Sequence, residues 1–172
     1  SIEIAVIRPD QESGIDLEAT KKRAEQGDAE SQYILANIMG IQGKHASQAD
    51  KEAFIKKAGH WLRKAAGQGY ADAQHQLGAM YEHGSGVEKD QKQAADWFLK
   101  AANQGHNEAQ CRLGLMYAQG RGVEENHKQA AHWYRKSALH PGQSGGGSAK
   151  STSACAQNEL GMLYATGKGV LQ

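Results

Sequence analysis

Apolar residues recur along this chain at the spacing of an amphipathic helix. Over residues 71–83 the spacing is i, i+4, i+7, i+8, which places the apolar side chains on one side of a helix. The stripe consists of Ala73, Leu77, Met80 and Tyr81. The pattern therefore predicts a helix over 71–83 that buries this one face.

A second amphipathic stripe begins a few residues later. It follows i, i+3, i+4, i+7 and comprises Ala94, Trp97, Phe98 and Ala101. Asp90 lies just before it and is a residue type that accepts hydrogen bonds from the first free N–H groups of a helix. We therefore expect a second helix that opens at Asp90 and packs antiparallel on the first.

This pair of helices is repeated. Residues 67–102 and 103–138 align without a gap, and 19 of the 36 aligned positions are identical. A fixed period of this length is typical of a solenoid, in which each unit buries its apolar face against its neighbours. Trp61, Trp97 and Trp133 recur at one position of the repeat. They are expected to hold equivalent places in successive units of the array. The sequence predicts an all-α fold, a right-handed superhelix of antiparallel helix pairs.

A glycine interrupts the first helix of three units. Gly78, Gly114 and Gly161 occupy the same position, and Ala36 stands there in the first unit. Glycine inside a helix costs about 1 kcal/mol relative to alanine. Its recurrence indicates a packing reason, namely that the second helix crosses too closely for a side chain.

A Gly-x-Gly-Val turn follows the first helix at residues 84–87, 120–123 and 167–170. The first glycine is expected to cap the helix in the left-handed conformation, and the valine to return to the core. Consecutive N–H groups in such a turn are also able to form an anion nest. We favour plain turn geometry, because no nearby residue is suited to phosphate.

These signals divide the chain into segments. Residues 1–15 form a non-repeat lead-in, either extended or disordered, and 16–26 form the helix of a leading half-repeat that Asp16 is expected to cap. The first complete unit carries six extra residues around 43–50, which we expect to lengthen its loop or its second helix. The other boundaries are 27–66 for this first unit, 67–102 for the second, 103–138 for the third, 139–155 for a flexible Gly/Ser-rich loop and 156–172 for a truncated fourth unit.

The fourth unit has a first helix and no second one. The apolar residues Leu160, Leu163 and Tyr164 then have a neighbour on one side only. We expect this end to be covered by further repeats of a longer protein, by a partner, or by end-to-end self-association. The Gly/Ser-rich loop before it is read as a surface loop, with an engineered linker as the alternative.

Composition argues against two kinds of partner. Lys and Arg number 20 and Asp and Glu number 19, so the chain lacks the basic excess that phosphate neutralisation requires, and we expect no nucleic-acid binding. The apolar run over residues 4–7 is too short to cross a bilayer, and we expect no membrane insertion. The chain begins with Ser1 and ends inside a repeat. We therefore expect this chain to be a piece of a longer protein. The sequence does not indicate its cellular compartment.

Residues with catalytic or metal-binding chemistry are scattered. The eight histidines include no pair at i, i+4 beside a carboxylate, as a zincin helix requires. No serine precedes a lysine by three residues. We therefore expect no metal, no cofactor and no catalytic residue.

Two cysteines are too few for a disulfide scaffold. Cys111 and Cys155 fall on the first helices of neighbouring units, with Cys155 aligned one turn before Cys111. The sequence allows either a disulfide between them or two free thiols. We favour free thiols.

The repeated motif resembles a known family. The pattern A-x-x-x-L-G-x-M-Y-x-x-G-x-G-V, then an Asp or Asn cap (Asp90 or Asn126), then A-x-x-W-[FY]-x-K-[AS]-A-x-x-G is similar to the Sel-one-like repeat, a branch of the tetratricopeptide-like α-solenoids. The resemblance covers about residues 16–172, with departures at Ala36, at Gly40 and in the two inserted stretches. It implies an adaptor that assembles protein complexes.

One branch of this family offers an alternative function. A cysteine-rich exported branch has been linked to β-lactam hydrolysis, and it carries a cysteine pair in each repeat. Such pairs are absent here. An exported factor with weak hydrolase or small-ligand-binding activity is therefore the alternative to a non-catalytic protein-binding module.

The candidate binding residues lie on the side of each first helix opposite the core stripe. This side is expected to line the concave surface of the superhelix, where a peptide or protein partner would bind. The residues are Tyr33, Asn37, His75, Ala79, Glu82, Cys111, Leu115, Ala118, Asn158 and Met162. The alternative is that these side chains pack against neighbouring helices.

Overall fold

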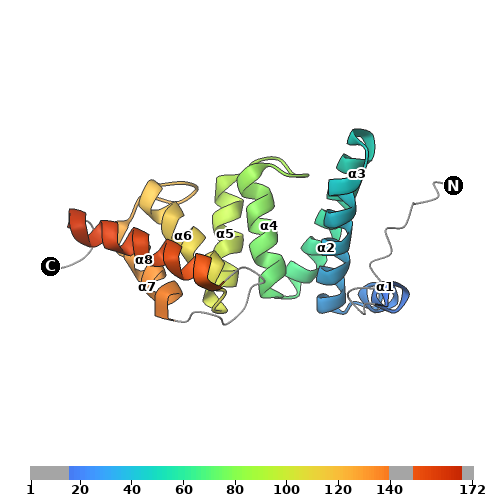
Figure 1. Ribbon diagram of the computed structural model, residues 1–172, viewed down its shortest axis with the longest axis horizontal. Coiled ribbons are helices and arrows are strands. Elements are labelled where there is room, and N and C mark those ends of the chain that lie inside the picture. The colour runs from blue at the N-terminus through green and yellow to red at the C-terminus, as the bar shows by residue number, and fades with distance from the viewer. Residues whose placement is uncertain (1–15, 140–148, 168–172) are drawn as a thin grey trace.

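The computed structural model describes residues 16–139 and 149–167, and these residues form an extended array of helices (Figure 1). Side chains are described for 16–139 and 157–167. The helices are α1 (Leu17–Glu25), α2 (Ala29–His45), α3 (Gln48–Gly67), α4 (Ala71–His83), α5 (Gln91–Asn103), α6 (Asn107–Gln119), α7 (His127–Leu139) and α8 (Ala149–Thr166). No strand occurs within the described ranges, so the all-α prediction is confirmed.

The helices are paired as the sequence predicted. Helices α2 and α3, α4 and α5, and α6 and α7 form three antiparallel pairs, and each second helix also packs against the first helix of the next pair. Helix α1 covers α2 at one end of the array, and α8 packs on α7 and α6 at the other (Figure 1). The result is a solenoid in which every interior helix has neighbours in two units.

The predicted N-caps start the helices. The side-chain oxygen Oδ1 of Asp90 accepts hydrogen bonds from the N–H groups of Lys92 and Gln93 at 2.9 and 3.0 Å. Asp16 and Asn126 accept in the same manner at the starts of α1 and α7. These short polar side chains satisfy N–H groups that have no partner inside the helix.

The Gly-x-Gly turn needs its two glycines for different reasons. Gly84 and Gly120 cap α4 and α6 in the left-handed conformation, with φ of 73° and 65°, as predicted. The second glycines, Gly86 and Gly122, lie against the previous unit. A Cβ atom on Gly122 would clash with the carbonyl group of Gln91 at the start of α5. The second glycine therefore lets the turn approach the neighbouring unit, a contact that the sequence did not reveal.

The six extra residues of the first unit lengthen both of its helices. Helix α2 has 17 residues and α3 has 20, whereas α4 and α5 have 13 each. Gln42 stands where the second unit has the capping Gly84, so α2 continues past this point. The connection shrinks to Ala46 and Ser47, and Ser47 caps α3. Lengthening of the second helix was predicted, whereas that of the first was not.

Helix α8 begins earlier than the repeat alignment indicated. It starts at Ala149, so the later part of the predicted loop over 139–155 is helical. Residues 149–155 contain neither glycine nor proline, so the helix is able to extend through them towards the N-terminus. Residues 140–148, the lead-in over 1–15 and the end of the third turn lie outside the described residues.

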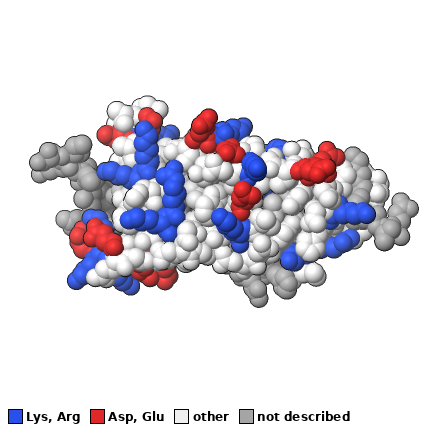
Figure 2. All heavy atoms as spheres, turned by 180° about the vertical axis from the view of Figure 1, so that it is seen from behind, with Lys and Arg blue, Asp and Glu red and all other residues white. Residues whose placement is uncertain are grey.

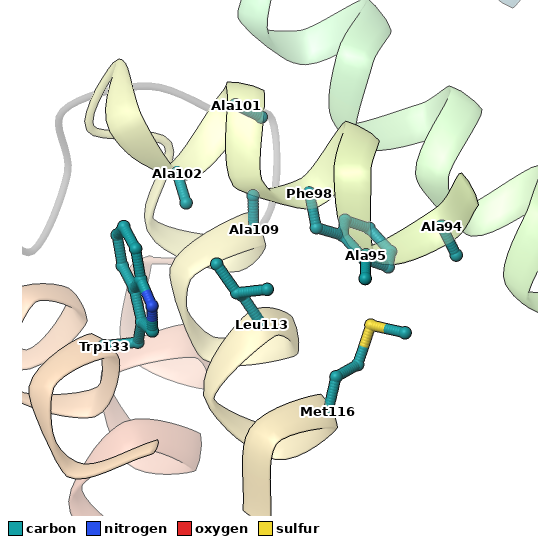
Figure 3. Close-up of a cluster of buried hydrophobic side chains, with 9 residues drawn as sticks. All are labelled: Ala94, Ala95, Phe98, Ala101, Ala102, Ala109, Leu113, Met116 and Trp133. Atoms are coloured by element: carbon teal, nitrogen blue, oxygen red, sulfur yellow. The ribbon is translucent and has the colours of Figure 1, made fainter. Parts of the chain in front are cut away.

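The core is divided among the junctions between helices. The second and third units share one cluster of buried side chains, in which the indole of Trp133 lies beside Ala102 and Leu113 (Figure 3). Trp61 and Trp97 pack against the equivalent cluster of the first and second units. A lysine three residues further on lies over each ring, with Nζ to centroid distances of 4.8, 3.8 and 4.8 Å for the three tryptophans in chain order. The predicted equivalence of the three rings is confirmed.

The recurring helix glycine has the predicted packing role. A Cβ on Gly78 would lie 2.9 Å from the ring of Phe98, and one on Gly114 would lie 2.6 Å from the ring of Tyr134. Among the described residues, no atom lies within 4 Å of the corresponding point on Gly161. The glycine is therefore required where an aromatic residue of the second helix faces it.

A glutamine on each of the first helices α2, α4 and α6 joins successive units. Nε2 of Gln74 donates to the carbonyl of Ala66 at the end of α3, at 3.1 Å. Gln32 and Gln110 donate in the same way to the ends of α1 and α5. Nε2 of Gln104 in turn donates to Oε1 of Gln74 at 2.7 Å. Each of these carbonyl groups also accepts from the N–H of the glycine that follows the helix, so the glutamine adds a second hydrogen bond to the helix end.

We predict opposite effects for the same substitution at two equivalent glycines. Gly78→Ala forces a methyl group against the Phe98 ring, and we expect it to lower the free energy of unfolding by about 1–3 kcal/mol. Gly161→Ala meets no atom of the described residues and gains helix propensity, so we expect it to raise that free energy by up to about 1 kcal/mol. Urea unfolding followed by circular dichroism measures both changes. Equal shifts in the same direction would contradict this account of the glycine.

Candidate binding surface

The first helices α2, α4, α6 and α8 adjoin one another. Nε2 of Gln76 on α4 donates to the hydroxyl of Tyr33 at 3.1 Å and to Oδ1 of Asn37 at 2.9 Å, both on α2. His75 of α4 lies 3.9 Å from the carboxylate of Glu108 on α6, and Cys111 of α6 packs in one cluster with Leu163 of α8. The ten predicted binding residues therefore lie on four adjoining helices.

One row of equivalent positions crosses these helices. It consists of Asn37, Ala79, Leu115 and Met162, one from each unit. The first three are half-buried, and Met162 is 58% exposed. Asn158 is also exposed on α8, and Ala118 is half-buried on α6. The row becomes more apolar towards α8, and its side chains reach the surface in every unit.

A second row is used to hold the units together. Tyr33 lies against Tyr70 with ring centroids 5.1 Å apart, and His75 stacks on His106 with centroids 4.5 Å apart. Both contacts join a first helix to the start of the next first helix. For these two residues, packing against a neighbouring helix is what the structure shows.

Cys111 occupies the same position in the third unit. Its sulfur is disulfide-bonded, so the expectation of free thiols is wrong. Cys155 is the other cysteine of the sequence, and its side chain lies outside the described residues. A covalent bond therefore takes the place of the ring contact that this position makes in the first two units.

Glu82 is buried among arginines. Its carboxylate is 4% exposed, with Oε1 3.2 Å from Nη1 of Arg121 and Oε2 3.6 Å from Nη1 of Arg112. Arg112 is on α6 and Arg121 is in the turn that follows it, so the ion pairs tie α4 to the next unit. Removing one partner of a buried pair leaves an uncompensated charge, which is strongly destabilising. Sequence reasoning missed the arginines, because pairs 30 and 39 residues apart leave no periodic signal.

Two histidines between α4 and α6 are kept neutral. Nδ1 of the buried His106 accepts a hydrogen bond from the N–H of Ala109, which places the ring proton on Nε2, 3.1 Å from Asp72. Burial lowers the pKa of His106, against the opposing effect of the Asp72 and Glu108 carboxylates. Burial, with the charges of His106 and Arg112, lowers the pKa of His75 to about 3. Both rings therefore pack as uncharged groups near neutral pH.

The described part of the chain offers no other obvious chemistry. Within it, no three His, Cys, Asp or Glu side chains are grouped to hold a metal ion. None of its helices combines the length and the apolar character that a membrane span requires. Basic and acidic side chains are interspersed on the face that Figure 2 shows.

We predict that acid destabilises the array through these two histidines. Their pKa values are lower in the folded than in the unfolded chain, so the unfolded chain binds more protons, and stability falls as the pH drops below about 6.5. The expected slope is at most about 1.4 kcal/mol per pH unit for each histidine. His75→Phe should flatten the profile between pH 7 and 4.5, and His132→Phe at an exposed site should not. Urea unfolding at several pH values gives the profiles, and parallel curves for all three proteins would contradict the assignment.

Comparison with known sequences identifies the repeat. The sequence model described as Sel1 repeat matches residues 29–70, 71–106, 107–140 and 156–172. The first three matches begin at the first residues of α2, α4 and α6, so the family's unit starts with the first helix. No curated protein gives a significant match.

Solved structures show the same architecture. A Sel1 repeat protein from Oxalobacter formigenes is 33% identical over 86% of this chain and 98% of its own, with a TM-score of 0.68. The protective antigen c5321, present in uropathogenic Escherichia coli strains and displaying an SLR fold, is 27% identical with a TM-score of 0.58. That match covers 91% of this chain and 38% of the antigen.

A third structure is similar in fold alone. Helicobacter pylori cysteine rich protein B is 22% identical over 73% of this chain and 91% of its own, with a TM-score of 0.51. The repeat match spans most of the chain, and the helix pairs, caps and glycine turns described above supply its structural basis. The chain belongs to the Sel1 repeat family.

Proposed function

We propose that this chain is a non-catalytic scaffold that binds a partner protein or peptide across the first helices α2, α4, α6 and α8. Sel1 repeat proteins are generally scaffolds for protein–protein interactions. The observation that carries the proposal is the row Asn37, Ala79, Leu115 and Met162, which presents one side chain from each unit along adjoining helices.

The row has the properties that peptide recognition needs. Leu115 and Met162 supply apolar contact area, and methionine adapts to differently shaped partners. The exposed Asn158 beside Met162 supplies an amide that both donates and accepts hydrogen bonds. A partner lying along the row would meet polar groups at α2 and apolar groups at α6 and α8.

Other predicted residues hold the first helices together. Tyr33 and His75 make contacts to the next unit, and Glu82 is held by two arginines. These bonds fix the spacing between first helices, so the surface is formed before a partner arrives. Pre-organisation of this kind reduces the entropy that binding costs.

The alternative function has no support of its own. The likeness to the Helicobacter pylori protein is one of fold, and fold does not imply activity. End-to-end self-association through the last unit stays a prediction, which the molecular mass in solution tests.

We predict that a photo-crosslinking residue at position 115 captures a partner that position 139 does not. Leu139 is the control because it is 72% exposed at the end of α7, on a second helix. Crosslinking in cells of the natural source, followed by mass spectrometry, identifies the captured protein. Equal capture from both positions would argue against binding along the first helices.

The purified partner then allows a quantitative test. We expect the double variant Leu115→Glu and Met162→Glu to bind it at least about tenfold more weakly, a loss of roughly 1.4 kcal/mol, because two charges replace apolar contacts. Leu139→Glu should bind as the unsubstituted chain does. Calorimetry measures the affinities, and full affinity in a folded double variant would exclude the row.

A further inference from the structure

We infer, on the basis of the function proposed above, that the partner places an aspartate or glutamate carboxylate on Arg112 as it lies along the row. Arg112 is on α6 three positions before Leu115, so the two side chains are neighbours on that helix. Its Nη1 lies 3.6 Å from Oε2 of Glu82 on α4, and Glu82 follows Ala79 by three positions. Arg112 therefore lies beside the two central members of the row.

The equivalent position in the second unit supports this placement. Gln76 stands there, and its Nε2 donates to Oδ1 of Asn37, the member of the row on α2, at 2.9 Å. The same amide also donates to the hydroxyl of Tyr33 at 3.1 Å. The side chain at this position therefore reaches from one first helix to the previous one. In the second unit its N–H donors are used within the chain.

In the third unit the donors of Arg112 are not used in this way. A guanidinium presents its N–H groups in a planar fork that matches the two oxygens of a carboxylate. Among the described residues, Arg112 makes no hydrogen bond, and Glu82 is the only acidic side chain within 4 Å of its nitrogen atoms. The Arg112 side chain is 39% exposed. Its N–H groups are therefore available to a ligand on the surface.

Glu82 does not neutralise both of the arginines beside it. Its Oε1 accepts a hydrogen bond from Nη1 of Arg121 at 3.2 Å, which is the shorter of its two arginine contacts. His83, whose Nε2 lies 3.9 Å from Oε2 of Glu82, adds no negative charge. One carboxylate thus faces two guanidinium groups, and one positive charge remains uncompensated. A partner carboxylate on Arg112 completes the charge balance through charge-assisted hydrogen bonds.

A single carboxylate fits this place better than a phosphate group. Phosphate recognition uses clusters of arginines, whereas the second arginine here is already bonded to Glu82. A phosphate ester carries up to about two negative charges, so Glu82 would repel it more strongly than a carboxylate. The equivalent position on α8 is Glu159, which would repel an acidic residue there. The segment that fits therefore has its acidic residue over Arg112 and apolar residues over Leu115 and Met162.

Random peptides displayed on phage and selected on the full chain serve as the probe. Peptides that also bind the double variant Leu115→Ala and Met162→Ala are discarded, so the remaining ones depend on the row. This variant is neutral, because glutamates would themselves repel acidic peptides. We expect the remaining peptides to share an aspartate or glutamate close to an apolar residue. In a synthetic copy, replacing that acid by its amide should weaken binding about tenfold in a fluorescence anisotropy titration.

The same peptide is titrated against variants of the chain. Arg112→Gln should bind it about tenfold more weakly, and should bind the amide copy as the unsubstituted chain does. Arg112→Lys keeps a cation beside Glu82 but lacks the planar fork, so it should give a smaller loss. It also provides the test should Arg112→Gln fail to fold. Arg63→Gln removes an exposed arginine on α3 and should leave binding unchanged.

Four results would overturn the inference and leave the proposed function intact. They are row-dependent peptides without a common acidic residue, full affinity of an acidic peptide for the folded Arg112 variants, equal losses for Arg112→Gln and Arg63→Gln, and tighter binding by a copy with phosphoserine in place of the acid. A failure to find any peptide that distinguishes the neutral double variant would instead contradict the proposed function, and the inference with it.

Discussion

The contact between a helix glycine and an aromatic ring sets the distance between the two helices of a unit. Phe98 occupies the space that a side chain on Gly78 would need, and Tyr134 does the same at Gly114. Because each ring lies directly against the backbone of the first helix, the alanines that flank it on the second helix are buried as well. In the second and third units, the second helix therefore packs on the first through an aromatic ring flanked by small residues, which lets the two helices approach closely.

Contacts between units combine shared apolar clusters with directional polar bonds. Gln74 bonds to a carbonyl at the end of α3, and Gln104 bonds to Gln74 from the following unit. The buried Glu82 pairs with Arg121 in the next turn. Such bonds are directional, so they fix how far one unit advances on the previous one. That advance determines the spacing of the first helices on the surface that we propose binds a partner.

Equivalent positions are used for different purposes along the array. The position of Tyr33 and His75 makes ring contacts in two units, and in the third it is the disulfide-bonded Cys111. The row through Leu115 and Met162 is instead open to the surface. A repeat scaffold tolerates this variation because its helix pairing depends on the glycine, the aromatic residue and the alanines, and not on the outward side chains.

The sequence alone determined the helix pairs, their N-caps at Asp16, Asp90 and Asn126, and the left-handed caps at Gly84 and Gly120, because each depends on residues within a few positions of one another. Periodicity also predicted the close crossing at Gly78. Only the tertiary structure decided which candidate residues reach the surface. It places Tyr33 and His75 in contacts between neighbouring units, and it buries Glu82. It also placed Gly122 against α5. These outcomes depend on residues 30 or more positions apart, whose pairing is set by how one unit packs on the next and leaves no local pattern.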